Sequence, residues 1–297
     1  MRQPSYAIIT PAHNEAAFLP RVIRAVAAQT WKPSRWVIVD DRSTDATWRL
    51  LTEARQAYPF IHPVRRTGKV RRELGAHVVR VFNDGLPHLH QEMEYLVKLD
   101  ADILLPEDYF ETLLARFQAD RSLGMASGKL FIEHRGAWIE ERFPDFHVTG
   151  ACKTYRMTCF RGINGLLPIY GWDILDGARA RMLGWETRSF RDLAIRHLRM
   201  TGSEKGMLRG HIGHGRGMYA VRALPLFVLG RAIYRALEPP HGAGLLILLG
   251  YALAWMRSEP RLEDLRLAEF LRREQLKRLL GKNIQQEVVR ARRRRQI

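Results

Sequence analysis

The segment from Tyr95 to Pro106 constrains the fold of this chain more than any other stretch. It begins with the apolar run Tyr95–Leu99, which is typical of a buried strand, and continues with Asp100 and Asp102. Residues two apart in an extended segment point the same way, so these two carboxylates converge. Converging carboxylates repel each other unless a cation lies between them, and Mg²⁺ and Mn²⁺ prefer such oxygen ligands. The alternative is a solvated loop in which two aspartates occur by chance.

Strands alternate with helices over the first part of the chain. Strand patterns cover Tyr6–Thr10, Trp36–Asp40 and Tyr95–Leu99, and helical patterns follow them at Glu15–Gln29, after Ser43 or Thr44, at Arg72–Phe82 and at Pro106–Ala119. This alternation predicts βαβ units in a mostly parallel sheet. Ligands bind outside the carboxyl ends of such strands. Three of those ends carry the polar clusters Pro11–Glu15, Asp40–Asp41 and Asp100–Asp102.

The order of three motifs resembles the inverting family 2 glycosyltransferases, which have the GT-A fold. The motifs are I-I-T-P-A-H-N-E, V-I-V-D-D-R-S-T-D-A-T and V-K-L-D-A-D-I, and the resemblance covers about residues 6–200. It implies an α/β fold with a Rossmann-like, mixed and mostly parallel sheet and flanking helices. It also implies transfer of a hexosyl group from a nucleotide-diphosphate sugar, with Mg²⁺ or Mn²⁺ as cofactor and one carboxylate as general base.

The resemblance assigns donor binding to the first two motifs. Pro11 and His13 match the segment that packs against the nucleotide base, although the family commonly has a tyrosine in place of His13. Glu15 follows this loop, and its alternative is a favourable charge at the start of the first helix. Asp41, with Asp40 as its neighbour, matches the carboxylate that recognises the base edge, because a carboxylate is a strong acceptor for a ring N–H.

Basic residues between 65 and 72 fall where the family places an arginine that contacts the diphosphate. The sequence does not say which of them makes this contact, and we take Arg71 and Arg72 as the candidates. The alternative is a basic face that is simply solvated.

The resemblance also assigns the metal site. Asp100 and Asp102 match the metal-binding pair of the family, and Asp100 also belongs to the donor site. His197 matches a late histidine that can complete the metal sphere, because neutral imidazole is a competent ligand; a core histidine is the alternative. The metal would offset the diphosphate charge and stabilise the leaving nucleotide.

The catalytic base is expected near the end of the resemblance. Counting back from the Gly-Trp pair at 184–185, the base position falls on Asp173, and Trp172 replaces the usual glutamate. Inverting transfer needs a base that deprotonates the acceptor hydroxyl as it attacks the anomeric carbon. Asp176 is the rival, and a helix N-cap is the alternative for Asp173. Gly150, which allows close backbone approach, and Trp172 are weaker candidates for the acceptor side.

The last third of the chain departs from the family. We divide the chain into a GT-A domain, residues 1–200, and an extension, residues 201–297. Glycines between 202 and 217 predict a flexible loop that acts as a mobile lid over the donor. The apolar patterns Ala223–Leu237 and Gly244–Met256 predict helices that either pack on the domain or lie on an anionic membrane. A charged helix follows from about Leu262 to Arg294.

The charge balance favours a polyanionic partner. The 297 residues include 48 Lys and Arg against 31 Asp and Glu, a net charge of +17, and the chain ends in an arginine-rich run. Basic residues bind anionic leaflets, so we expect a cytoplasmic protein attached peripherally to the inner face of the cell membrane. Ala243–Met256 is shorter than the ~20 residues of a membrane span. The N-terminus lacks a signal-peptide pattern, and two cysteines make neither a zinc cluster nor a disulfide framework.

Three functions compete at this point. The first is metal-dependent sugar transfer to a glycan or lipid-linked acceptor, as in polysaccharide biosynthesis. The second is nucleic-acid binding, but no recognition helix, RRM or zinc finger accompanies the positive charge, so we expect no nucleic-acid partner. The third is nucleotidyl transfer, which usually has a Gly-rich basic loop after the first strand, where this chain has Pro11–Glu15.

Overall fold

The computed structural model describes residues 3–68, 76–89, 92–134, 136–199, 207–237, 241–282 and 284, with the side chains of 134 and 207–209 left aside. Its strands are β1 (Tyr6–Ala12), β2 (Arg35–Asp40), β3 (Ile61–Arg65), β4 (Tyr95–Leu99), β5 (Ile103–Leu104), β6 (Leu123–His134), β7 (Ala137–Glu140), β8 (Cys152–Arg156) and β9 (Glu186–His197). Its helices are α1 (Leu19–Ala27), α2 (Thr47–Ala57), α3 (Ala76–Gly85), α4 (Tyr109–Ala119), α5 (Met157–Gly162), α6 (Trp172–Met182), α7 (Met207–Ala220), α8 (Pro225–Leu237), α9 (Ala243–Met256) and α10 (Leu265–Leu279), with a 3₁₀ turn η1 (Leu86–His88).

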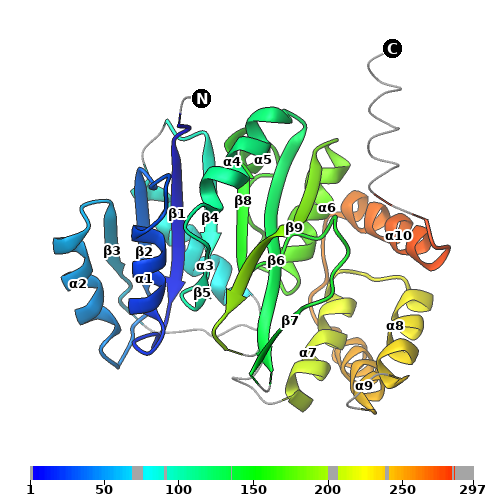
Figure 1. Ribbon diagram of the computed structural model, residues 1–297. Coiled ribbons are helices and arrows are strands. Elements are labelled where there is room, and N and C mark those ends of the chain that lie inside the picture. Colours follow the sequence, from blue (N-terminus) through cyan, green and yellow to red (C-terminus); the bar gives the residue numbers. More distant parts are fainter. Residues whose placement is uncertain are drawn as a thin grey trace.

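One mixed sheet forms the centre of the molecule (Figure 1). Its strand order is β3-β2-β1-β4-β8-β6-β9-β5, with β7 paired to β6. The strands from β3 to β4 pair in parallel, and the pairing becomes antiparallel between β4 and β8. The predicted α/β class, with a mixed sheet and flanking helices, is confirmed. The carboxyl ends of β1, β2 and β4 meet at one edge of the sheet, where the polar clusters were expected.

The first strands are continuous apolar runs because helices cover both faces of the sheet. Tyr6 and Ile8 of β1 belong to a buried cluster with α1, α2 and α4, whereas Ile9 belongs to a cluster with α3, α5 and α6. A strand buried on both faces has no polar side to alternate with. β1 also extends through Pro11 to Ala12, beyond its predicted end. Proline is tolerated there because β4 pairs with β1 only as far as Ile9.

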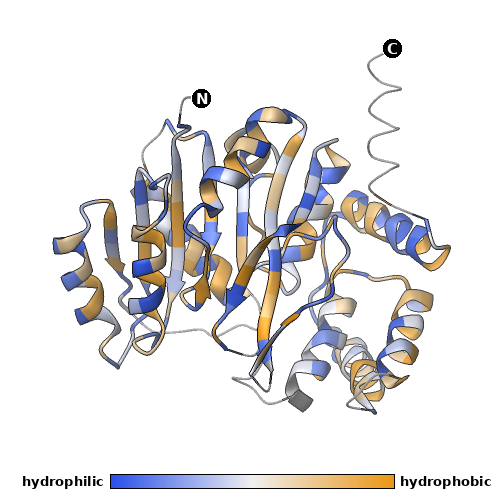
Figure 2. Ribbon diagram, viewed as in Figure 1, coloured by the Kyte–Doolittle hydropathy of each residue, from blue (hydrophilic) through white to orange (hydrophobic). Residues whose placement is uncertain are grey.

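The C-terminal helices pack on the sheet body through α6. Leu175 and Ala178 of α6 share one buried cluster with residues of α7 to α10, namely Met218, Val221, Ala223, Val228, Ile247, Leu262, Leu267, Ala268 and Leu271. Figure 2 shows strongly hydrophobic residues along α8 and α9. The two predicted apolar helices are therefore present and packed on the protein. Within the described ranges, none of the helices combines the length and apolarity that a membrane crossing requires.

The predicted glycine-rich loop is wrong for residues 207–217, which lie in the helix α7. Gly215 of α7 and Gly250 of α9 serve close packing between these two helices. A Cβ added at Gly215 would lie 2.0 Å from the Ile247 carbonyl oxygen, and one added at Gly250 would lie 2.0 Å from the Ile212 carbonyl oxygen. A lid made of residues 207–217 is excluded by this packing, and residues 201–206 lie outside the described part of the chain.

The packing of α7 on α9 predicts opposite effects for two glycine substitutions in α7. Gly215→Ala should lower the free energy of unfolding by about 1–3 kcal/mol, because its methyl group overpacks the contact with α9. Gly210→Ala is the matched control: its Cβ meets nothing within 4 Å, so it should raise stability by about 0.5–1 kcal/mol through helix propensity. Urea unfolding followed by circular dichroism measures both. Equal effects of the two substitutions would contradict the packing.

Candidate active site

The loop after β1 and the loop after β2 form one unit at the edge of the sheet. Asn14, in a left-handed conformation (φ 56°), accepts a hydrogen bond from the backbone N–H of Thr44 at 2.8 Å and donates its own N–H to the hydroxyl of Ser43 at 2.9 Å. His13 Nδ1 lies 2.7 Å from the carbonyl oxygen of Asp41. The predicted base-binding loop is thus joined to the predicted base-recognising carboxylate. Asn14 makes this connection, although the sequence did not single it out.

Asp41 is a buried anion with several cationic partners. Its carboxylate accepts hydrogen bonds from Arg66 at 2.8 Å, from Arg42 and from His77. Burial opposes ionisation, but the hydrogen bonds from His77 and Arg66 outweigh it and lower the pKa of Asp41. Asp41 is therefore ionised at neutral pH, as an acceptor for a ring N–H must be.

The other predicted donor residues have different surroundings. Asp40 is fully buried, and its Oδ1 accepts the backbone N–H of Ser43 at 3.2 Å. This hydrogen bond stabilises the loop after β2. Pro11 is partly buried and is the second-last residue of β1, beside this loop. Arg71 and Arg72 lie outside the described residues. Of the same basic run, Arg66 also binds Asp84 at 2.6 Å.

Asp102 is held by His197 and Arg199 at the junction of β4, β5 and β9. Its Oδ2 lies 3.0 Å from His197 Nε2 and accepts a hydrogen bond from Arg199 Nε at 2.6 Å. Burial would raise the pKa of Asp102, but His197 and Arg199 lower it below its ordinary value. Burial would lower the pKa of His197, and its hydrogen bond with Asp102 raises it instead. The predicted pair of Asp102 and His197 is therefore in contact.

Asp100 is paired with a lysine from its own strand. Lys98 donates to the Asp100 carboxylate and also to the carbonyl oxygen of Gly150, at 2.6 Å. Burial raises the pKa of Asp100, Lys98 opposes this, and the charge of Asp102 adds to the rise. The two carboxylates thus repel each other, as their spacing predicted.

The donor set at this point fits a divalent cation. Among the described residues, Asp100 Oδ2 and Asp102 Oδ1 receive no hydrogen bond, because Lys98 takes the other oxygen of Asp100 and the cations at Asp102 both take Oδ2. No three His, Cys, Asp or Glu side chains in the described part of the chain are arranged as a full ligand set. Mg²⁺ and similar ions commonly take one or two carboxylates and complete their sphere with substrate phosphates, so two such oxygens beside His197 suit them.

Glu15 lies before the first helix and not in its first turn. The helix α1 begins at Leu19, and Glu15 precedes it in a turn where its backbone N–H donates to the hydroxyl of Thr47 at 2.8 Å. The buried carboxylate of Glu15 binds Arg199. Because Arg199 also binds Asp102, it links the loop after β1 to the predicted metal site. The sequence did not identify Arg199, which becomes a neighbour only through the β5–β9 pairing.

The rival base, Asp176, is a structural ion. It is buried, its two oxygens lie 2.9 and 3.0 Å from Lys153 Nζ, and it accepts a hydrogen bond from the Tyr155 hydroxyl at 2.6 Å. Burial raises the pKa of Asp176, while Lys153 and Tyr155 oppose the rise. With its oxygens engaged inside the protein, Asp176 has no access to an acceptor hydroxyl.

Asp173 lies in the first turn of α6, whose N-cap is Gly171 in a left-handed conformation. The N-cap alternative for Asp173 is therefore excluded. Its backbone carbonyl accepts a hydrogen bond from Lys153 Nζ at 2.8 Å, whereas its half-buried carboxylate receives no hydrogen bond from any described residue. The lysine thus fixes the position of Asp173 and leaves its side chain available for a substrate.

Gly150 and Trp172 connect this helix to the metal site. A Cβ at Gly150 would lie 3.1 Å from the Trp172 ring and 3.2 Å from Asp173 Cβ, so the close approach that glycine allows is to α6. Trp172 is buried, with Lys98 Nζ and Lys153 Nζ each 5.3 Å from its ring centroid. Both ammonium groups thus lie over this ring. The assignment of Trp172 to the acceptor side stays a prediction.

These contacts form one continuous series along the edge of the sheet. They run from Asp41 through the loop of His13 to Glu15, then through Arg199 to Asp102, and from Asp100 through Lys98 and Gly150 to Asp173. The three parts that the sequence predicted separately are therefore joined.

Two comparisons of sequence agree with this arrangement. Residues 7–140 match the sequence profile described as glycosyl transferase family 2. A curated protein of Streptococcus pneumoniae, named glycosyltransferase GlyA, is 28% identical over 120 residues, which is 39% of this chain. The matched stretch spans only 16% of the length of that relative.

Solved structures show the same architecture at low sequence identity. The mannosyltransferase PcManGT from Pyrobaculum calidifontis, in complex with GDP-Man and Mn²⁺, has a TM-score of 0.58 and 17% identity, covering 95% of this chain and 89% of that one. TarS 1–349 of S. aureus in complex with UDP-GlcNAc has a TM-score of 0.54 and 12% identity, covering 94% and 93%. The fold is thus the GT-A fold of these solved glycosyltransferase structures, and residues 7–140 are similar to glycosyl transferase family 2.

Proposed function

We propose that this chain is an inverting glycosyltransferase that moves a hexosyl group from a nucleotide-diphosphate sugar to a glycan or lipid-linked acceptor. The observation that carries the proposal is the continuous series of contacts from Asp41 through Asp102 to Asp173. It supplies, in order, an acceptor for a base N–H, oxygens for a cation beside the diphosphate, and an unengaged carboxylate. The bound GDP-Man and UDP-GlcNAc of the similar structures support a nucleotide-sugar donor.

The donor side uses charge and shape. The ionised Asp41 accepts a hydrogen bond from the nucleotide base, and the His13 ring, held by the Asp41 carbonyl, offers a flat face for stacking. The diphosphate then extends toward Asp100 and Asp102. Asp100, Asp102 and His197 would hold Mg²⁺ or Mn²⁺, which supplies electrostatic stabilisation of the leaving diphosphate.

The acceptor side uses Asp173 as the general base. Its carboxylate takes the proton of the acceptor hydroxyl as that oxygen attacks the anomeric carbon, from the face opposite the departing diphosphate. The configuration at that carbon is inverted as a result. Lys153 holds the backbone of Asp173 in place at 2.8 Å, so the carboxylate keeps one orientation relative to the metal site.

We further propose that the protein works at the cytoplasmic face of the cell membrane. Its net charge of +17 and the exposed apolar residues of its C-terminal helices support peripheral attachment to an anionic surface. An acceptor with a lipid anchor would then meet the enzyme in two dimensions.

Removing the base should stop chemistry without weakening donor binding. We expect Asp173→Asn to lower kcat by about 10²–10⁴-fold, the usual contribution of a general base, with an unchanged Kd for the donor. The measurement is a screen of nucleotide sugars with Mn²⁺ or Mg²⁺, following release of the nucleoside diphosphate. Asp108→Asn is the control, because this carboxylate at the start of α4 makes no capping hydrogen bond. Full transfer by Asp173→Asn would show that another group is the base.

Inversion is tested on the wild-type product by NMR of the newly formed linkage. A product with the donor's anomeric configuration would exclude the proposed single displacement.

Loss of Asp102 should weaken metal binding itself. We expect Asp102→Ala to reduce Mn²⁺ affinity at least 10–100-fold, roughly the penalty known for perturbed metal sites, because one of the two available oxygens is lost. Electron paramagnetic resonance of Mn²⁺ measures binding in the presence of a nucleoside diphosphate and without any transfer. Asp192→Ala is the control, since Asp192 pairs with Arg116 at an exposed site. Equal Mn²⁺ affinities of the two variants would contradict the assignment.

A further inference from the structure

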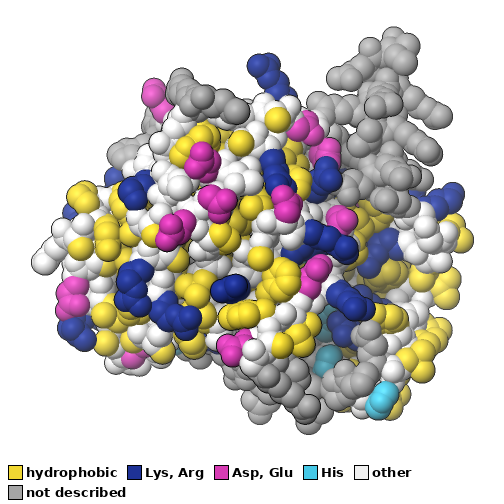
Figure 3. Space-filling model, viewed as in Figure 1, with side chains coloured by type: hydrophobic (Ala, Val, Ile, Leu, Met, Phe, Trp, Pro, Cys, Tyr) yellow, Lys and Arg dark blue, Asp and Glu magenta, His cyan; other side chains and the backbone are white. Residues whose placement is uncertain are grey.

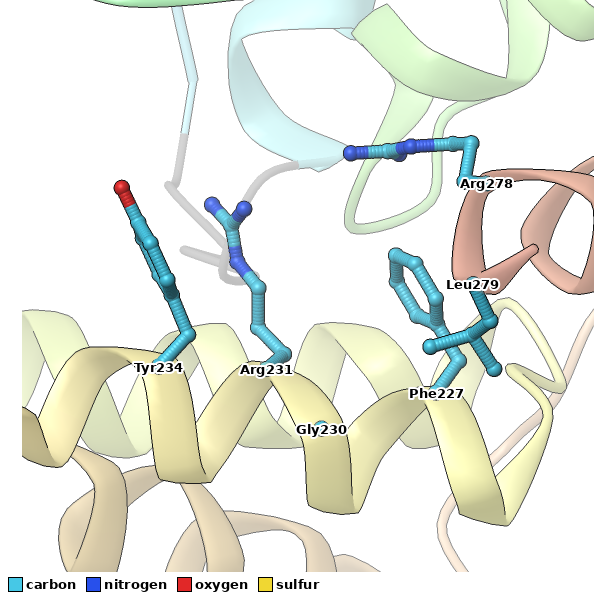
Figure 4. A pocket seen from close by; sticks show the side chains of 6 residues that line it. All are labelled: Phe227, Gly230, Arg231, Tyr234, Arg278 and Leu279. Atoms are coloured by element: carbon cyan, nitrogen blue, oxygen red, sulfur yellow. The ribbon is translucent and has the colours of Figure 1, made fainter. Parts of the chain in front are cut away.

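A second polar site lies between α8 and α10, apart from the edge of the sheet. It is a cavity of about 240 Å³. Figure 4 shows Tyr234 and Arg231 extending from α8 toward the space that Arg278 of α10 spans from the other side. The cavity is lined by Phe227, Gly230, Arg231, Tyr234, Arg278 and Leu279. Two guanidinium groups and a phenol therefore face one small space.

Arg278 has no ion-pair partner among the described residues. The neighbouring Arg181 takes both oxygens of Glu274, at 2.7 and 2.8 Å, and Arg278 lies over the ring of Phe227 at 5.0 Å from the centroid. Partial burial lowers the pKa of Arg278, the charge of Glu274 opposes this, and the charge of Arg181 adds to it. An anion bound in the cavity would pair with this guanidinium group.

An apolar stripe of α8 runs beside the cavity. Leu226, Ile233 and Leu237 are 59%, 54% and 74% exposed, and Leu229 is also exposed. At 3.6 residues per turn these side chains share one face of the helix, and the cavity-lining residues occupy the next face around. The third face, with Val228 and Ala232, is buried. Figure 3 shows Lys and Arg side chains gathered between the sheet and the C-terminal helices, beside exposed hydrophobic ones.

The charges of cavity residues and of the proposed base act on the same two histidines. Burial lowers the pKa of His147 to about 4, and the charges that act on it include those of Asp173 and Arg278. Burial likewise lowers the pKa of His214 to about 4, and the charges of Arg231 and Asp173 act on it. Each histidine is thus within electrostatic reach of both the cavity and Asp173.

We propose that this cavity binds the phosphate headgroup of an anionic membrane lipid, while the apolar stripe of α8 enters the acyl boundary of the bilayer. A helix with cations on one face and large apolar side chains on the next is the pattern of an interfacial element. The cavity is smaller than the about 300–1,000 Å³ of typical small-molecule sites, which suits a headgroup whose acyl chains stay outside. The net charge of +17 favours an anionic surface over a neutral one.

The inference rests on the membrane attachment in the proposed function and makes it specific. It orients the protein with α8 on the bilayer, which is the surface that would present the hydroxyl of a lipid-linked acceptor. Sugar transfer to a soluble acceptor does not require it, so binding and transfer are tested separately.

The test is co-sedimentation of the full chain with vesicles, in the absence of any nucleotide sugar. The probes are phosphatidylcholine vesicles with and without phosphatidylglycerol. We expect binding only with phosphatidylglycerol. The double variant Arg231→Gln, Arg278→Gln should lower the partition coefficient about 30-fold, the effect of two basic residues at an anionic surface. Leu226→Gln combined with Ile233→Gln should also weaken binding. This variant should still fold, because both side chains are exposed.

The matched control is Arg266→Gln combined with Arg273→Gln, which removes the same charge from exposed positions of α10 outside the cavity. This control should bind almost as the wild type does. Equal losses in the control and the cavity variant would show attraction by net charge alone and overturn the proposal. Failure of the wild type to sediment would overturn it too, as would binding of soluble glycerol phosphate at the two arginines without vesicle binding. A dimer that Leu226→Gln with Ile233→Gln dissociates, in the absence of vesicle binding, would assign the stripe to a second copy instead.

Discussion

Two lysines at opposite positions of neighbouring strands organise the candidate active site. Lys98 of β4 and Lys153 of β8 are direct partners in the antiparallel pair, and the ring of Trp172 lies 5.3 Å from both ammonium groups. Like charges in directly opposite positions destabilise a sheet unless each is neutralised. Asp100 neutralises Lys98 and Asp176 neutralises Lys153. The same ammonium groups bind the backbone carbonyls of Gly150 and of the residue that we propose as base. The spacing between metal site and base is therefore set by the two strands.

Glu15, Asp41 and Asp102 are balanced by arginines in the same way. Arg199 bridges Glu15 and Asp102, and Arg66 bridges Asp41 and Asp84. Each bridge joins elements that are far apart in the chain, so the loops at the edge of the sheet are held by charge pairs rather than by apolar packing. The diphosphate and the cation that we propose for this site would interact with groups that are already paired. The carboxylates can stay ionised in a partly buried place for this reason.

The helix α6 connects the site to the C-terminal helices. Its first turn carries Asp173, and its middle, through Leu175 and Ala178, belongs to the buried cluster of α7 to α10. Glycines at the α7–α9 contact let these helices pack closely enough to form a firm support. The helix α8 and the helix that carries the proposed base therefore share one buried cluster.

Asp173 became a candidate only through the family resemblance. The patterns of the sequence itself determined the α/β class, the strands with continuous apolar runs and the position of Asp41 and Asp102 at one edge of the sheet. These conclusions follow from local periodicity and from the rule that parallel strands end on one side. The tertiary structure alone decided which charges meet. Arg199 and Lys153 are invisible as site residues in the sequence, because the fold brings them to their partners, and strand pairing likewise brings Lys98 to the carbonyl of Gly150. It also decided that the glycines before residue 220 pack a helix: a glycine that permits a turn and one that permits close contact look alike until the neighbouring helix is in place.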